Sequence, residues 1–147
     1  YLTIEAKPTT AKTGENRCTS FSPEKDRARL DGYIEAFPLL LEKKYDYWKN
    51  ILSTRHQQHK KMVIWGSGSK AAAFLTSLDI KDEIGLVIDI NPFKDGFFMA
   101  GSGHKIVLPS ALTDYQPDTV IIMNGIYRNE ISKMLGDLQL HPEILNL

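Results

Sequence analysis

An apolar stripe of helical period dominates residues 21–61. Its members follow one another at steps of three or four residues: Leu30, Ile34, Phe37, Leu41, Tyr45, Trp48 and Leu52. Ser22 and Pro23 are a start signal, because serine is a favoured N-cap and proline fits the first helical position. Pro38 lies inside the stripe without shifting its phase, although proline removes one helical hydrogen bond. The pattern predicts one long kinked helix whose stripe packs on the following domain or on a partner.

From residue 62 onward, short apolar runs alternate with amphipathic stretches. Five runs predict strands: Met62–Trp65, Leu86–Asp89, Lys105–Leu108, Thr119–Met123 and Glu143–Leu147. Two stretches predict helices: Ser69–Leu78 and Tyr127–Leu138. Strands that alternate with helices are typical of a parallel sheet with right-handed crossovers. We therefore expect an α/β fold, a Rossmann-like doubly wound parallel sheet of about five strands preceded by the long kinked helix.

The first 20 residues have a different pattern. Tyr1–Ala6 alternates like a short strand, and Lys7–Ser20 is rich in Pro, Thr, Lys and Gly, as linkers are. The chain starts with Tyr rather than Met, which we interpret as a piece of a longer protein. We expect three parts: the end of an upstream domain with a linker over residues 1–20, a connecting helix over 21–61, and a Rossmann-like domain over 62–147.

Composition and charge exclude several classes of protein. The 147 residues are 42% hydrophobic and 24% charged, which is typical of one globular domain. The 18 basic and 18 acidic side chains balance, so no overall field favours nucleic acid or an anionic membrane. No apolar run is long enough to cross a bilayer. The single cysteine, Cys18, excludes an internal disulfide framework and favours a reducing, cytoplasmic location.

A glycine-rich turn gives the sharpest chemical signal. Gly66–Ala71 follows the first predicted strand, opens a helix and fits G-x-G-x-x-A. Gly66 permits a tight turn, Gly68 lets a ligand approach the backbone, and the free N–H groups of a helix start attract anions. The competing interpretation is a small-residue turn that any doubly wound domain needs, with or without a ligand.

Three further features are expected at the same end of the sheet. Asp89 ends the second predicted strand, where a carboxylate either accepts hydrogen bonds from a ribose or forms a turn with the following residues. Lys94, in the loop after it, and Arg128, after the fourth strand, are either phosphate contacts or solvated surface residues. The predicted substrate-binding set is Gly66, Ser67, Gly68, Ser69, Lys70, Asp89, Asn91, Lys94 and Arg128.

Other chemistry is disfavoured by the residues present. A loop that binds S-adenosylmethionine usually has an acidic residue two before the first glycine and a third glycine, but Ile64 and Lys70 occupy those positions. A P-loop needs a different glycine spacing. His56 and His59 have no evident further ligand, so no metal site is predicted. No catalytic residue is predicted either.

Three segments, Val63–Lys70, Val87–Gly96 and Pro117–Ile122, resemble the C-terminal domain of SAM-dependent sugar C-methyltransferases. The middle segment follows that family's V-V-D-x-N/S-P-x-K-Q-G pattern, with Asp95 in place of the Gln. Ala100–Gly103 replaces the family's Pro-Gly-Thr. A weaker resemblance, through a Gly-rich first turn and a D-x-N-P-x-K-x-G loop, is to the nucleotide-sugar-binding N-terminal domain of sugar acyltransferases.

The main resemblance implies an accessory domain that helps to close a cleft over a nucleotide-linked sugar. S-adenosylmethionine and the catalytic base would then belong to an upstream methyltransferase domain of the same chain, and no cofactor is expected in this part. Two alternatives remain. One is a free-standing NAD(P)-binding oxidoreductase-like module, which the glycine turn and Asp89 suit. The other is a structural or dimerisation domain whose nucleotide site is vestigial.

Overall fold

The computed structural model describes residues 23–147, so the strand expected at Tyr1–Ala6 and the linker expected at Lys7–Ser20 lie outside the described residues. The chain divides into two units, Tyr1–Leu40 and Leu41–Leu147. No described helix combines the length and the apolar character needed to cross a membrane.

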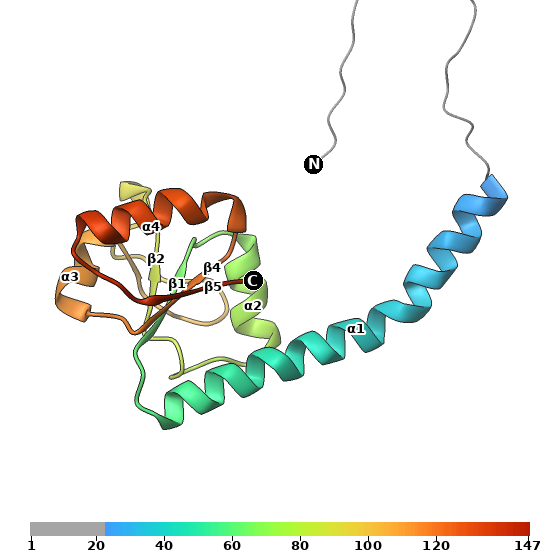
Figure 1. The fold of residues 1–147 in the computed structure, drawn as a ribbon, viewed down its shortest axis with the longest axis horizontal. Coiled ribbons are helices and arrows are strands. Elements are labelled where there is room, and N and C mark those ends of the chain that lie inside the picture. Colours follow the sequence, from blue (N-terminus) through green and yellow to red (C-terminus); the bar gives the residue numbers. More distant parts are fainter. Residues whose placement is uncertain (1–22) are drawn as a thin grey trace, which may run out of the picture. The chain divides into compact units, whose positions relative to one another are not determined.

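Helix α1 (Pro23–Gln57) is continuous through Pro38, as the unbroken phase of the stripe predicts (Figure 1). Burial of the stripe is confirmed at Trp48 and Leu52, which belong to the core of the second unit. Trp48 is 2% exposed and meets Phe74 edge-on, with ring centroids 5.2 Å apart. In the first unit the stripe is exposed, at Leu30, Ile34 and Phe37.

A five-stranded parallel sheet forms the centre of the second unit and confirms the predicted fold class. Its strands are β1 (Met62–Trp65), β2 (Leu86–Ile88), β3 (Ile106–Val107), β4 (Thr119–Ile122) and β5 (Glu143–Asn146). They are ordered β3-β2-β1-β4-β5, so β1 is central. β1 pairs with β2 and with β4, for example Ile64 with Val87 and with Ile121. The chain therefore builds one half of the sheet, crosses back to β1 and builds the other.

Helices cover both faces of the sheet, as expected for a doubly wound domain. They are α2 (Ser69–Ser77), α3 (Leu112–Tyr115) and α4 (Arg128–Asp137), and Figure 1 shows α2 and α3 on opposite sides of the strands. Side chains of β1 alternate between two apolar clusters. Met62 and Ile64 join α1 and α2, whereas Val63 and Trp65 join α3 and α4.

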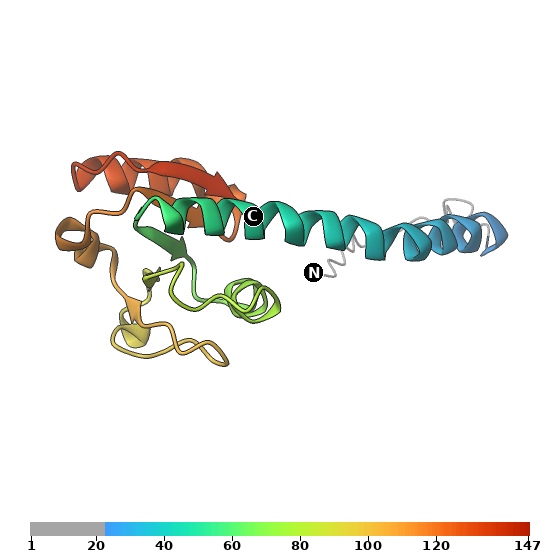
Figure 2. The ribbon, with the colours of Figure 1, turned by 90° about the horizontal axis from the view of Figure 1, so that it is seen from below.

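The short elements were not predicted from the sequence. They are α3 and three 3-10 turns, Pro92–Lys94, Pro109–Ala111 and Gly125–Tyr127. Each is too short to show a hydrophobic period. The segment between β2 and β3 also forms an arm, closed by an antiparallel bridge between Phe98 and Lys105 (Figure 2).

Candidate functional site

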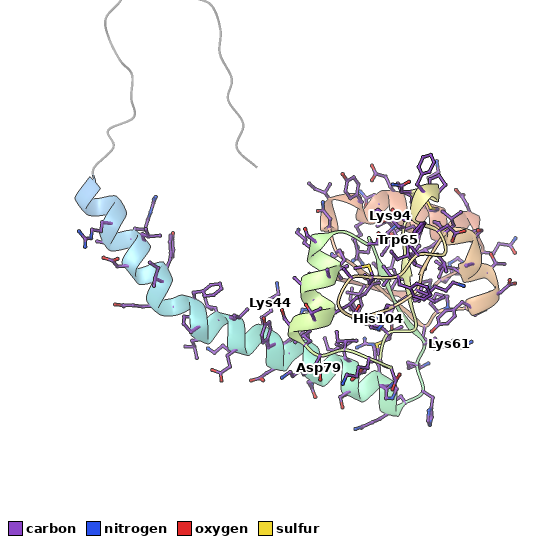
Figure 3. All side chains as sticks on the ribbon, turned by 180° about the vertical axis from the view of Figure 1, so that it is seen from behind. Lys44, Lys61, Trp65, Asp79, Lys94 and His104 are labelled. Atoms are coloured by element: carbon purple, nitrogen blue, oxygen red, sulfur yellow. The ribbon has the colours of Figure 1, made fainter. Side chains whose placement is uncertain are left out.

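The carboxyl ends of all five parallel strands meet at one end of the sheet, which we call the carboxyl end. The opposite end, from which the strands start, is the amino end. Figure 3 labels Lys94 near the end of β1 that Trp65 closes, and labels Lys61, the residue before β1, at the other end. In doubly wound folds ligands lie outside the carboxyl ends of the strands, where the strand order reverses. That point falls beside β1 in this sheet.

The turn after β1 needs glycine at its first position. Gly66 has a φ of +107°, which residues with a side chain rarely adopt. Its N–H donates to the carbonyl of Ile88 at 2.7 Å, which holds the turn against β2. A Cβ at this position would lie 3.5 Å from Cβ of Met123, in ordinary contact. The predicted tight turn is therefore present. It requires glycine because of the positive φ and not because a side chain would lack space.

Gly68 leaves open space at the start of α2. It is the N-cap of that helix, with extended backbone at φ −82° and ψ −171° and no side-chain cap. A Cβ added to Gly68 would meet nothing within 4 Å. The first N–H groups of a helix have no intrahelical acceptor and carry the positive end of its dipole. An anionic group could therefore approach this backbone without a steric obstacle.

A cluster of Ser67, Asp89 and Lys94 joins the loop after β1 to the loop after β2. The N–H of Ser67 donates to Oδ2 of Asp89 at 3.1 Å, and the Ser67 hydroxyl donates to the same oxygen. Nζ of Lys94 lies 3.0 Å from that oxygen and 3.0 Å from Oγ of Ser67. The cluster ties together two loops that are far apart in the sequence.

Asp89 is ionised throughout the physiological range. Burial raises the pKa of its carboxyl, but hydrogen bonds from Ser67, Asn91 and Lys94 outweigh burial and lower the pKa to about 2. The N–H of Asn91 donates to Oδ1 of Asp89 at 3.0 Å. Two roles are predicted for Asp89, a ribose contact or a turn with the following residues. This hydrogen bond shows that the turn is formed.

The loop after β2 is held by its own side chains. Oδ1 of Asn91 accepts from the N–H of Phe93 at 3.0 Å and caps the 3-10 turn Pro92–Lys94. Oδ1 of Asp95 accepts from the N–H of Leu108 at 3.2 Å and ties the loop to the end of β3. Asp95 thus has a structural contact where the resembled family has Gln.

The remaining predicted residues do not join this cluster. Ser69 is exposed in the first turn of α2. Lys70 lines a hollow of about 330 Å³ between α1 and α2, together with Lys44, Tyr45 and Trp48. Arg128 starts α4, and its Nη1 donates to the carbonyl of Ile144 at 3.2 Å.

The loop after β2 also carries a histidine that is turned inward. His104 is 7% exposed, and its Nε2 lies 2.9 Å from the carbonyl oxygen of Lys81. His56 and His59, for which no metal site is predicted, are both exposed near the end of α1. Within residues 23–147 no three histidine, cysteine or carboxylate side chains are grouped to hold a metal ion.

Bulky apolar side chains stand exposed in both loops that flank the glycine turn, a feature that the sequence analysis missed. Phe93, after β2, is 87% exposed, and Ile126, after β4, is 80% exposed. Ile90 and Tyr127 are exposed beside them in the sequence. Exposed apolar residues of this size mark binding surfaces when they occur together. Their only sequence signal is their position in turn-rich loops directly after strands.

Comparison with known proteins gives one family match. Residues 4–140 match the family described as C-methyltransferase C-terminal domain. No curated protein is matched. Among solved structures, UDP-D-quinovosamine 4-dehydrogenase from Vibrio fischeri is similar, with 23% identity, a TM-score of 0.47 and coverage of 60% of this chain and 77% of that one. RSP, a Rex-family repressor, is similar with 16% identity, a TM-score of 0.43 and coverage of 69% and 60%.

Proposed function

Because the chain belongs to the C-methyltransferase C-terminal domain family, we propose that it is the accessory domain of a SAM-dependent C-methyltransferase. Its task is to hold a nucleotide-sugar-like substrate at the carboxyl end of its sheet. An upstream methyltransferase domain of the same parent chain is the partner that binds S-adenosylmethionine and carries the catalytic base. The domain itself supplies binding and exclusion of water rather than a reacting group.

The open backbone at Gly68 is the observation that carries this proposal. A phosphate-bearing ligand needs N–H groups at a helix start that no side chain covers. A Cβ at Gly68 would meet nothing within 4 Å, so this side of the turn is open. Ala71, fully buried, lets α2 pack closely on the sheet and so fixes the direction of those groups. The exposed Phe93 and Ile126 on either side offer apolar contacts to the rest of the ligand.

S-adenosylmethionine itself does not suit this turn. The acidic residue expected two positions before the first glycine is replaced by Ile64, which is fully buried in β1. The third glycine is replaced by Lys70, in the first turn of α2. We therefore expect no binding of S-adenosylmethionine by this chain. Titration calorimetry tests this, and a dissociation constant tighter than about 10 μM would contradict it.

Chemical-shift mapping tests the proposed site directly. The 147-residue chain is titrated with UDP, dTDP and NAD in turn, up to millimolar concentration. We expect UDP or dTDP to shift the amides of Gly66, Ser67, Gly68 and Asn91. A response to NAD alone would favour the oxidoreductase-like alternative. No response to any of the three, or shifts confined to the amino end, would favour a vestigial structural domain.

A further inference from the structure

We infer that Lys94 contacts the anionic part of the ligand, and that Asp89 positions Lys94 instead of reading a ribose. The inference rests on the function proposed above. It deepens that function by assigning the selectivity of the site to phosphate charge. A ligand without phosphate should then be a poor one, whatever its base and sugar.

The carboxylate of Asp89 is already occupied by the protein. Its Oδ2 accepts from the N–H and the hydroxyl of Ser67 and from Nζ of Lys94, and its Oδ1 accepts from the N–H of Asn91. A carboxylate has about four acceptor positions in all. The side chain is also only 13% exposed. A ribose that approached Asp89 would therefore have to displace contacts that hold both loops.

Lys94 retains a donor. An ammonium group has about three N–H donors, and Ser67 and Asp89 account for two of them. The Lys94 side chain is 41% exposed, so the remaining donor can reach a group in solvent. Asp89 and Ser67 hold the ammonium at the residue next to Gly68 in the sequence, where a Cβ would meet nothing within 4 Å.

The other two predicted cations do not compete for this position. Lys70 lines the hollow between α1 and α2, and Arg128 donates to the carbonyl of Ile144 on β5. Of the three, only Lys94 hydrogen-bonds to the turn after β1. Its neighbour Phe93 is 87% exposed, so a charged side chain and an exposed apolar side chain lie next to each other in one loop.

The test compares three probes: inorganic pyrophosphate, UDP and uridine. They are titrated against the 147-residue chain and followed by the amide shifts of residues 66–68. Pyrophosphate and UDP should bind, and uridine should not. Lys94→Met should weaken pyrophosphate and UDP by about tenfold or more, the scale of a lost charged hydrogen bond. It should also reduce the dependence of affinity on salt. Lys94→Arg should restore most of the affinity, and Lys133→Met, on the exposed face of α4, is the matched control.

Asp89→Asn separates positioning from ribose recognition. If Asp89 only positions Lys94, the ratio of pyrophosphate affinity to UDP affinity should not change in this variant. A loss confined to UDP would show that Asp89 reads the ribose and would overturn the inference. So would pyrophosphate binding that Lys94→Met leaves unchanged, a result that does not depend on the folding of the Asp89 variant. If neither pyrophosphate, UDP nor dTDP binds the wild type, the proposed function fails with it.

Discussion

The two ends of the sheet each carry an aspartate–lysine pair of nearly equal length. At the carboxyl end Nζ of Lys94 lies 3.0 Å from Oδ2 of Asp89, and at the amino end Nζ of Lys60 lies 2.9 Å from Oδ1 of Asp118. The Asp89 side chain is 13% exposed, whereas that of Asp118 is 37% exposed. Asp118 also accepts from the N–H of Lys61 at 2.8 Å.

Burial and additional donors make the two pairs different. Hydrogen bonds from Lys60 and Lys61 lower the pKa of Asp118, but solvent screens that pair. Around Asp89 three residues donate to one carboxylate and join two loops. Distance alone therefore does not show which ion pair supports a site. The number of donors and the exclusion of water decide it.

A change in the shared core should affect both ends alike and gives the largest effect. Trp48→Ala removes a buried indole and its contact with Phe74. We expect the free energy of unfolding to fall by about 3–5 kcal/mol. Chemical denaturation measures it, and an unchanged midpoint would mean that α1 does not pack in the core in solution. Lys49→Ala, whose side chain is exposed on the same helix, is the control.

The two aspartates should differ in what they contribute to stability. Asp89→Asn should lower the free energy of unfolding by about 1–3 kcal/mol, because charged hydrogen bonds are lost from a site with little solvent. Asp118→Asn should cost about 0–1 kcal/mol, as exposed ion pairs do. Urea unfolding measures both free energies. Equal losses for the two variants would show that the Asp89 pair contributes no more to stability than the Asp118 pair.

Stability should depend on pH through Asp89. Its pKa is about 2 in the folded protein and near 3.9 when unfolded. The lower folded value means that ionisation stabilises the fold above about pH 4, by about 2–3 kcal/mol. That contribution should be lost as the pH falls from about 4 to 2. The stability difference between wild type and Asp89→Asn should therefore shrink over this range, and a constant difference would contradict the assignment.

Two glycines provide the smallest and most local comparison. At Gly85, before β2, an added Cβ would lie 2.0 Å from the hydroxyl oxygen of Tyr115, so Gly85→Ala must displace that ring. We expect a loss of about 1 kcal/mol. Gly68→Ser, at the open carboxyl end, should change stability by less than about 0.5 kcal/mol, because serine adds a Cβ and is also a favoured N-cap. Thermal unfolding of both variants checks this, and a larger loss at Gly68 would show that the turn after β1 is not open.

The regular elements could be predicted from the sequence because their signals are local. Met62–Trp65 is a continuous apolar run and Thr119–Ile122 is apolar after its first residue, and both are buried on both faces as parallel strands are. The turn at Gly66 also has a local signal, since glycine tolerates a positive φ. The four-residue helix at Leu112–Tyr115 has no period to detect. The exposure of Leu30, Ile34 and Phe37 could not be predicted, because the spacing of apolar residues does not show whether another segment covers them.

The candidate site could be predicted as a set of positions but not as a set of contacts. The strand pattern places Ser67, Asp89 and Lys94 at the same end of the sheet. Which cation pairs with Asp89 depends on side-chain geometry across two loops. In the structure Lys94 joins Ser67 and Asp89, whereas Lys70 lines the hollow between α1 and α2 and Arg128 donates to Ile144. The hydrogen bonds that Asp89 accepts from Ser67, Asn91 and Lys94 depend on the same geometry, because these neighbours come together only in the folded chain.

The central position of β1 has a consequence for how the chain folds. Met62–Trp65 pairs with Leu86–Ile88 on one side and with Thr119–Ile122 on the other, so neither half of the sheet is complete until distant segments have met. The chain loses the entropy of closing these loops before the strand contacts that offset it have formed, and parallel sheets fold slowly as a result. The turn at Gly66–Gly68 leaves the strand on which both halves depend. We therefore expect this turn to reach its final geometry late, when β4 docks beside β1.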